Sequence, residues 1–397
     1  MSERAIECSI LRGGTSRGVF FRSSALPEDR AAVEQVLLNV FGSPDTRQIS
    51  GLGGASSQTS KAAIIGPPTR EDADVDYTFA QVSITAPLVD WGGNCGNISA
   101  AVGPYAIDAG LVPATGDLTR VRIHNTNTGR IIVAQVPTRD GRAVVDGDYS
   151  IPGVPGTGSR ILLEFTEPAG SVTGALLPTG HARETLALAD GRSFTASIVD
   201  AANPVVFLPA AELGLTGTEL PAEIEENTDA TAVLEEVRAI AAEMLGIVPD
   251  RGIATSTSPG LPKVGVVAPP AEYTTSTGER IATHEADVAG RLMSMQTAHR
   301  SYMVTGAICT AAAAFIAGTI VHEVARPRGD RPDPHTIRIA HPYGVMEAAV
   351  RVDASAQPIH ILGVAVGRTA RHVLDGIVWV PDRLLAGAAL HQASASA

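Results

Sequence analysis

Lys61 stands where a lysine side chain can do acid–base chemistry. It follows the polar residues 58–60, in a loop rich in Ser, Thr and Gly, and precedes the apolar run 62–65, which has the composition of a buried strand. Burial disfavours the charged ammonium and lowers the pKa of a lysine, and a neutral amine is a competent general base. A surface lysine with its ammonium in water is the commoner alternative, but the polar loop before Lys61 favours the catalytic interpretation.

Cys95 is the second candidate for a catalytic group. Glycines lie on both sides of it, and the alanine-rich segment 97–109, which we predict to be a helix, follows at once. The N-terminus of a helix carries unpaired N–H groups and a partial positive charge, which lower the pKa of a thiol. A small buried thiol that packs like alanine is the alternative. We expect Lys61 and Cys95 to face each other across a cleft, with Lys61 as the base. Cys95 then either donates the proton or only shapes the site while Lys61 performs both proton transfers.

Several other segments are suited to binding a carboxylate. The loop 12–16 offers backbone N–H groups and two hydroxyls, and Lys263 repeats the setting of Lys61 in the second half of the chain. The turn 306–309 repeats the one at Cys95, although we expect Cys309 itself to be a packing residue. The predicted binding residues each offer a hydroxyl, an amide, a cation or a backbone N–H group: they are Thr15, Ser16, Ser60, Asn94, Gly96, Asn97, Lys263, Gly306, Ala307 and Ile308.

The elements that must position these residues occur twice in the same order. Each half has a strand, a turn, a strand, a helix (30–41 and 230–245), a loop that ends in lysine, more strands, a Gly-x-x-Cys turn and an alanine-rich helix (97–109 and 310–320). We therefore predict an α+β protein of two pseudo-symmetric domains. Each is a mostly antiparallel sheet wrapped around a central helix, and the active site lies in the cleft between them.

The length, the net charge, the apolar segments and the cysteine count of the chain exclude several classes of function. The 397 residues exceed what one hydrophobic core supports, and the net charge of −12 argues against a nucleic-acid partner. Residues 1–12 lack the apolar run of a signal peptide and residues 309–321 are too short to span a bilayer, so we predict a cytoplasmic protein without a membrane partner. Three cysteines make no disulfide framework, and no motif has metal-binding or nucleotide-binding spacing, so we expect neither a metal nor a cofactor.

Motifs spread over nearly the whole chain resemble those of one known family. The segments that carry the resemblance are Arg12-Gly-Gly-Thr-Ser16, Thr59-Ser-Lys61, Asp90-Trp-Gly-Gly-Asn-Cys-Gly-Asn97, Gly174-Ala-Leu-Leu-Pro178 and His341-Pro-Tyr-Gly344. In these segments the chain is similar to the methylaconitate isomerase (PrpF-like) family, which has the diaminopimelate epimerase-like fold.

The resemblance implies an activity. One lysine and one cysteine, here Lys61 and Cys95, catalyse a 1,3-allylic proton shift in an unsaturated di- or tricarboxylic acid such as 2-methylaconitate, aconitate or 4-oxalomesaconate. No cofactor takes part. Arg17 and Ser50 stand where the family usually has lysine and aspartate. Neither change touches the acid–base pair, and either is compatible with a different substrate.

The resemblance also implies a domain organisation. The last strand, after about residue 375, returns to the first domain, so that residues 1–179 and about 375–397 form one domain and residues 180–374 the other. For the assembly we consider a homodimer.

Two other function classes fit some of these residues. A two-thiol amino-acid epimerase requires a second reactive cysteine, and the apolar setting of Cys309 disfavours it. The second class is a non-catalytic protein that binds a tricarboxylate or assists an iron–sulfur dehydratase. Such a protein would need the anion-binding residues, but it would not need Lys61 as a base. The sequence does not identify the substrate, because the shape of the pocket decides which substituent is accepted.

Overall fold

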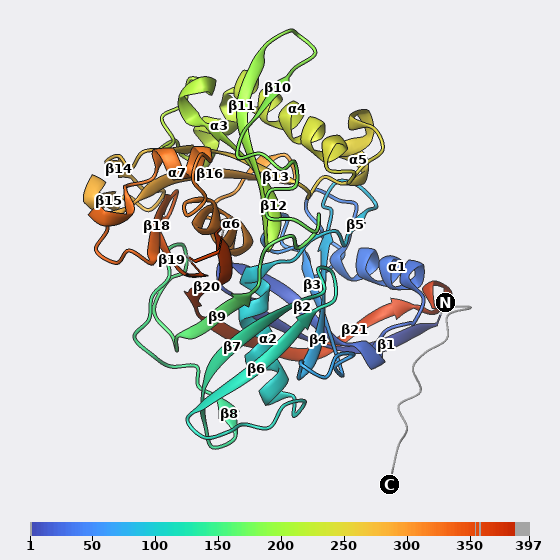
Figure 1. Ribbon diagram of the computed structural model, residues 1–397. Coiled ribbons are helices and arrows are strands. Elements are labelled where there is room, and N and C mark those ends of the chain that lie inside the picture. The colour runs from blue at the N-terminus through green and yellow to red at the C-terminus, as the bar shows by residue number, and fades with distance from the viewer. Residues whose placement is uncertain (1, 354, 357–358, 386–397) are drawn as a thin grey trace.

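Strands wrapped around two buried helices make up most of the molecule (Figure 1). The computed structural model describes residues 2–353, 355–356 and 359–385. The first half of the chain surrounds helix α2 (Gly96–Asp108) and the second half surrounds helix α6 (Val304–Ala313). Apolar side chains of both helices belong to one continuous core. The predicted α+β fold with two pseudo-symmetric parts is confirmed.

The strands of the first half alternate between antiparallel and parallel pairing. Strands β1 and β2 are antiparallel, β2 and β3 parallel, β3 and β4 antiparallel, β4 and β6 parallel, and β6, β7 and β9 antiparallel in turn. Their bounds are β1 (Glu3–Gly13), β2 (Ser16–Arg22), β3 (Lys61–Gly66), β4 (Val75–Val82), β5 (Val89–Asp90), β6 (Leu118–Asn125), β7 (Arg130–Arg139), β8 (Arg142–Ala143) and β9 (Ile161–Thr166).

The second half repeats this alternation pair by pair. Strands β11 and β12 are antiparallel, β12 and β13 parallel, β13 and β16 antiparallel, β16 and β18 parallel, and β18, β19 and β20 antiparallel in turn. Strand β20 also pairs with β9, which joins the two halves. The bounds are β10 (Glu184–Ala187), β11 (Ser193–Ala201), β12 (Asn203–Pro209), β13 (Lys263–Ala268), β14 (Tyr273–Thr274), β15 (Arg280–Ile281), β16 (Val288–Ser294), β17 (Thr297–Ala298), β18 (Thr336–His341), β19 (Gly344–Asp353) and β20 (His360–Arg368).

Two longer helices pack on the outside of the sheets (Figure 1). Helix α1 (Arg30–Phe41) matches its prediction; it starts where the Asp29 carboxylate accepts the Ala32 N–H and ends at Gly42, which has a φ of 69°. Helix α4 (Thr228–Met244) starts earlier than predicted because the Asn227 side chain caps it. The remaining helices are α3 (Pro221–Glu226), α5 (Ala254–Thr257) and α7 (Ile320–Val324).

The prediction for the second central helix is wrong. Helix α6 begins at Val304 and ends at Ala313, so the predicted turn 306–309 lies inside it. Gly306 has a packing role, because a Cβ atom there would lie 2.3 Å from Cδ1 of Leu292. The sheet therefore approaches α6 closely at this glycine, and the backbone does not turn.

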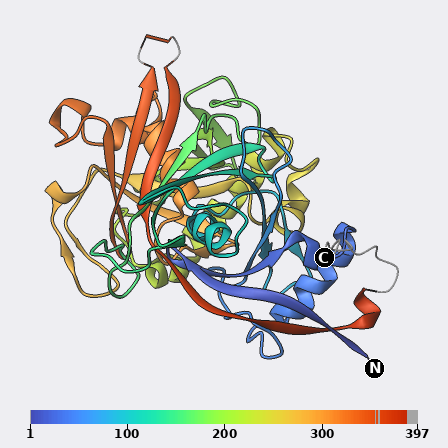
Figure 2. The same ribbon diagram turned by 90° about the horizontal axis from the view of Figure 1, so that it is seen from below.

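The last strand returns to the first half of the chain, as the resemblance implies. Strand β21 (Ala370–Pro381) pairs antiparallel with β1 along its whole length, and the two run side by side in Figure 2. The pairing begins at Ala370, before the predicted return at about residue 375. Residues 386–397 of the predicted C-terminal segment lie outside the described residues, and the domain boundary at 179/180 stays a prediction.

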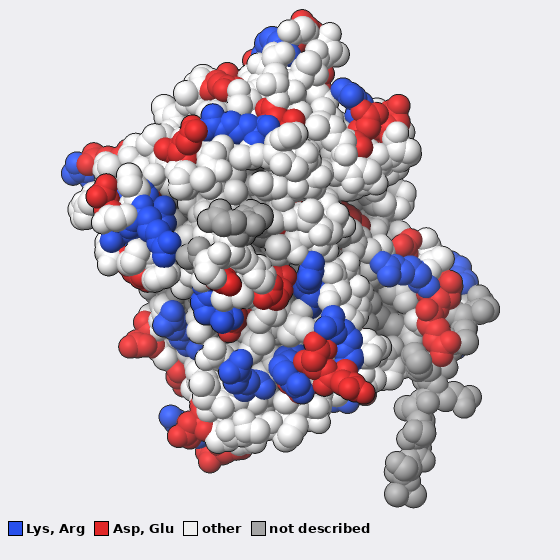
Figure 3. Space-filling view, viewed as in Figure 1, with Lys and Arg blue, Asp and Glu red and all other residues white. Residues whose placement is uncertain are grey.

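The surface carries both signs of charge. On the face shown in Figure 3, Lys and Arg side chains are interspersed with Asp and Glu. Among the described residues, no helix combines the length and the apolar character that crossing a bilayer requires.

Candidate active site

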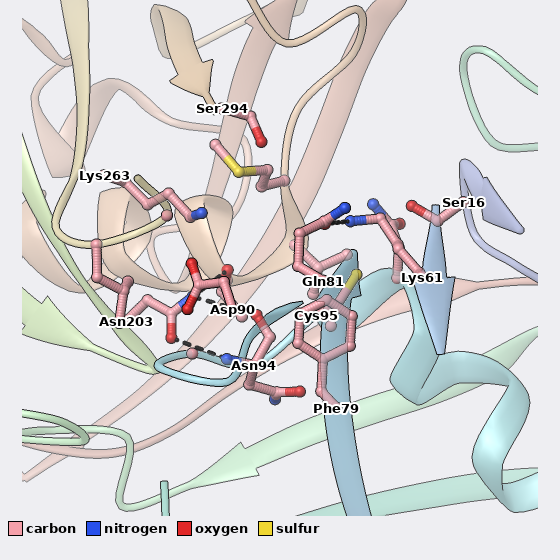
Figure 4. A pocket seen from close by; sticks show the side chains of 18 of the residues that line it. Ser16, Lys61, Phe79, Gln81, Asp90, Asn94, Cys95, Asn203, Lys263 and Ser294 are labelled. Atoms are coloured by element: carbon pink, nitrogen blue, oxygen red, sulfur yellow. Dashed lines mark hydrogen bonds between the residues drawn. The ribbon is translucent and has the colours of Figure 1, made fainter. Parts of the chain in front are cut away.

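A cavity lies between the two halves of the chain and draws its walls from both (Figure 4). It brings together seven of the residues predicted from the sequence: Ser16, Lys61, Asn94, Cys95, Gly96, Asn97 and Lys263. These residues come from the start of β2, the start of β3, the N-terminus of α2 and the start of β13. The repeat places the corresponding elements of the two halves on opposite sides of the cavity.

Lys61 is buried, with 7% of its surface exposed, and is fixed by Gln81 of strand β4. Its Nζ donates a hydrogen bond of 2.5 Å to Gln81 Oε1, while Gln81 Nε2 donates to the backbone carbonyls of Ser57 and Ser60. The amide of Gln81 therefore presents its oxygen to Lys61. Burial lowers the pKa of Lys61, against the opposing effect of Cys95 and Asp90.

Cys95 is the residue at which helix α2 begins. Its carbonyl accepts the Ser99 N–H, and its thiol lies close enough to Lys61 to oppose the lowering of the pKa of that lysine. The N–H groups of Gly96 and Asn97, in the first turn of α2, belong to the set that has no partner within a helix. The expectation that Lys61 and Cys95 face each other across the cleft is wrong. Both come from the first half of the chain, and they lie side by side (Figure 4).

Lys263 and the start of helix α6 form the opposite wall. Lys263 is the first residue of β13, as Lys61 is of β3. Burial lowers the pKa of Lys263 to about 8, with Asp90 acting in the opposite direction and Lys61 adding to the lowering. Val304 and Thr305, in the first turn of α6, line the cavity here. Each half thus contributes one lysine and one helix N-terminus.

Two hairpin turns hold the helix N-termini in place. In the first half, Thr15 bonds to Asn97 through both its N–H and its hydroxyl, and this hydroxyl also meets Ser301 of the second half at 3.0 Å. In the second half, Asn203 bonds to Thr305 and reaches across to the backbone N–H and carbonyl of Asn94. Each turn therefore fixes its own central helix and contacts the other half.

Five of the predicted binding residues do not line the cavity. Thr15 does not line the cavity, and its N–H and its hydroxyl are already hydrogen-bonded to Asn97. Ser60 is fully buried and bonds to Gln48 at 2.8 Å. Gly306, Ala307 and Ile308 are buried within α6 and do not form a turn. The cavity meets this helix at its first turn, two residues earlier.

Cys309 packs as predicted. It is buried, its thiol donates to the Val199 carbonyl at 3.1 Å, and burial raises its pKa. A site with two reactive thiols is therefore not formed here. In the described part of the chain, no group of His, Cys, Asp and Glu is arranged to hold a metal ion.

Sequence reasoning missed several residues of the cavity: Gln81, Asp90, Asn203, Ser294, His299 and Thr305. His299 is neutral, because burial lowers its pKa to about 3. Its Nδ1 accepts the Ser301 N–H, so Nε2 carries the proton. Asn203 had a signal in the sequence, because its turn repeats the one at Thr15. His299 had none, because it lies in an irregular segment before α6.

Comparison with known proteins identifies the family. The family model described as PrpF protein matches residues 3–381. The chain belongs to this family. The 3-methylitaconate isomerase of Eubacterium barkeri is 47% identical over 376 residues, which cover 94% of this chain and 97% of that protein. The 2-methyl-aconitate isomerase of Shewanella oneidensis is 37% identical over 389 residues, covering 95% and 97%.

A solved structure of a methylitaconate-delta-isomerase is also similar to the chain. Its TM-score is 0.78 at 46% sequence identity, over 98% of both chains. These relatives are isomerases, and the expectation that the chain is an enzyme of this class is confirmed. Since the match extends over nearly the whole of each protein, it includes both halves of the fold and every wall of the cavity.

Proposed function

We propose that the chain catalyses a 1,3-allylic proton shift in an unsaturated di- or tricarboxylic acid such as 3-methylitaconate or 2-methylaconitate. The observation that carries this proposal is the buried amine of Lys61, oriented by Gln81 at a cavity that two helix N-termini line. A lowered pKa makes Lys61 a base, and the helix N-termini suit carboxylates. The printed names of the relatives supply the substrate class.

Carboxylate binding uses groups on both walls. The N–H groups at the starts of α2 and α6 point their partial positive charge at the cavity, and protonated Lys263 adds a full charge. The hydroxyl of Ser16 is buried and has no hydrogen-bond partner among the described residues, which leaves it free to donate to the substrate. Neutral His299 contributes an Nε2–H donor and is too weakly basic to activate Cys95 as a hydrolytic nucleophile.

The proton transfer begins with Lys61. Its neutral amine removes the proton from the carbon next to the double bond, and the electron pair spreads over the three-carbon allylic unit and the adjacent carboxylate. Donors around the cavity stabilise the charge as it develops. Return of a proton to the far carbon completes the shift.

Because Lys61 and Cys95 lie side by side, the proton leaves and returns on the same face of the substrate. The ammonium of Lys61 can itself deliver the proton, and Cys95 then shapes and polarises the site. A relay in which Cys95 delivers the proton is the second route that this geometry allows.

Deuterium exchange tests the proposal. The purified full chain in D₂O should introduce deuterium into 3-methylitaconate or 2-methylaconitate and move the double bond, as followed by NMR, without added metal, nucleotide or partner protein. Lys61→Ala should abolish both. Binding without exchange would support a non-catalytic tricarboxylate-binding protein and refute the proposal.

Location and assembly stay predictions. A cytoplasmic location and the absence of a nucleic-acid partner follow from the sequence argument, and the mixed charges in Figure 3 support the second of these. The homodimer is a prediction for the assembly that no sequence feature carries.

A further inference from the structure

The turn between strands β16 and β17 holds two residues in a strained backbone conformation. Ser294 pairs with Thr297, which leaves a turn of two residues. These are Met295, with a φ of 53°, and Gln296, with a φ of 62°. Both angles lie in the left-handed region, as in a type I′ turn, where glycine and asparagine are favoured and other side chains strain the backbone. Strain of this kind clusters at active sites and ligand-binding sites.

The strained turn forms part of the wall of the active-site cavity. Both Ser294 and Met295 line the cavity, and Figure 4 shows Ser294 at the top of the view. The Nε2 of Gln296 donates a hydrogen bond to the Pro259 carbonyl at 3.2 Å, which ties the turn to a neighbouring loop. The hairpin and this hydrogen bond therefore hold Met295 at the cavity.

Met295 differs from the other apolar residues of the cavity wall, because the protein's own packing does not cover its side chain. Several of those residues belong to the main hydrophobic core: Phe79, Met303 and Val304. Leu261 is buried, and its Cδ1 lies 3.3 Å from the place of a Cβ atom at Gly92. Met295 is half-buried and belongs to no hydrophobic cluster of the described residues. Its side chain therefore has apolar surface left for a ligand.

The proposed substrates carry an alkyl group that needs an apolar contact. In 3-methylitaconate and 2-methylaconitate, a methyl group is attached to the carbon skeleton that carries the carboxylates. The helix N-termini and Lys263 bind the carboxylates in the proposed function, and these polar groups do not suit a methyl group. Methionine is unbranched, flexible and polarizable, which suits it to pack against a small alkyl group.

We propose that Met295 is a specificity-determining residue that packs against the alkyl substituent of the substrate and excludes groups larger than methyl. The strained turn is then retained because it presents this side chain to the substrate. The inference rests on the proposed function for the substrate class. It concerns binding, so unreactive ligands can test it independently of turnover.

Three saturated dicarboxylates with a growing substituent test the contact. Methylsuccinate, 2,3-dimethylsuccinate and 2-ethyl-3-methylsuccinate are the unreactive counterparts of itaconate, 3-methylitaconate and 3-ethylitaconate, and calorimetry on the full chain measures their affinities. The wild type should bind the dimethyl acid most tightly. Met295→Ala opens the space, so the affinity of the ethyl acid relative to the dimethyl acid should rise by about tenfold. The kcat/KM ratio of 3-ethylitaconate to 3-methylitaconate should shift in parallel.

Met295→Asn separates the contact with the substrate from the stability of the fold. Asparagine tolerates the left-handed conformation of the turn and is polar. This variant should unfold at or above the wild-type temperature, yet lose the preference for 2,3-dimethylsuccinate over methylsuccinate. Met244→Ala is the matched control, because this methionine is exposed at the end of helix α4 and does not line the cavity. It should leave all the affinity ratios unchanged.

Three results would each overturn the inference. The first is a wild type that binds the ethyl acid as tightly as the dimethyl acid, and the second is a Met295→Ala affinity ratio equal to that of the wild type. The third is a lowered unfolding temperature of Met295→Asn, which would show that Met295 serves the fold. If the wild type turns over none of the unsaturated acids, the proposed function fails, and the calorimetric ratios still decide the role of Met295.

Discussion

Replacing Lys263 with methionine should stabilise the fold while it weakens substrate binding. Burial lowers the pKa of Lys263 from 10.5 to about 8 in the folded chain. The unfolded chain therefore binds more protons than the folded chain between these two values. The stability rises with pH in this window, and the full penalty of burying the ammonium is present below pH about 8.

The size of this penalty follows from the shift in pKa. A difference of about 2.5 units, at about 1.36 kcal/mol per unit, corresponds to about 3 kcal/mol. Methionine has a similar length and no charge, so it removes this penalty, in which the attraction of the ammonium to Asp90 is already included. We expect Lys263→Met to be more stable than the wild type by about 3 kcal/mol at pH 7, and the difference to vanish as the pH approaches about 10.5.

Binding should respond in the opposite direction. Loss of a charged hydrogen bond to a carboxylate costs about 1.5–3 kcal/mol, so KM should rise by about 10- to 100-fold while kcat changes much less. Thermal unfolding at several pH values and steady-state kinetics at pH 7 measure both effects. A variant that is less stable at pH 7, or a stability difference that does not change with pH, would refute the burial argument. An unchanged KM with a collapsed kcat would make Lys263 a catalytic group.

Three further variants test the site. Lys61→Ala should lower kcat by about 10²–10⁴-fold, because it removes the general base, with circular dichroism unchanged; near-normal isomerisation would end this assignment. Cys95→Ser should retain at least about a tenth of the wild-type kcat if Lys61 returns the proton itself, as its neighbouring position favours; near-complete loss would establish the relay through the thiol. Asn203→Ala should lower the free energy of unfolding by about 2–3 kcal/mol, because it leaves buried groups of Asn94 and Thr305 without their hydrogen-bond partner. An unchanged unfolding midpoint would show that Asn203 does not hold the two halves together.

The sequence by itself determined the features that depend on neighbouring residues. Lys61 was identified by the polar loop before it and the apolar strand after it. Helix α1 matched its prediction because Asp29 and Gly42 mark its two ends locally. The repeat of element order predicted two similar halves, since each half folds by the same local patterns of strands, turns and helices.

The tertiary structure alone decided which residues meet. Lys61 and Cys95 became neighbours because β3 packs against α2 within one half, whereas the sequence argument placed them on opposite walls. Gly306 looked like a turn residue, and only the side chain of Leu292 packed against it shows why a glycine is needed inside a helix. Asp90 and His299 come from different halves of the chain, and only the contacts between the halves bring both to one cavity. Such contacts join residues far apart in the chain, and no local pattern records them.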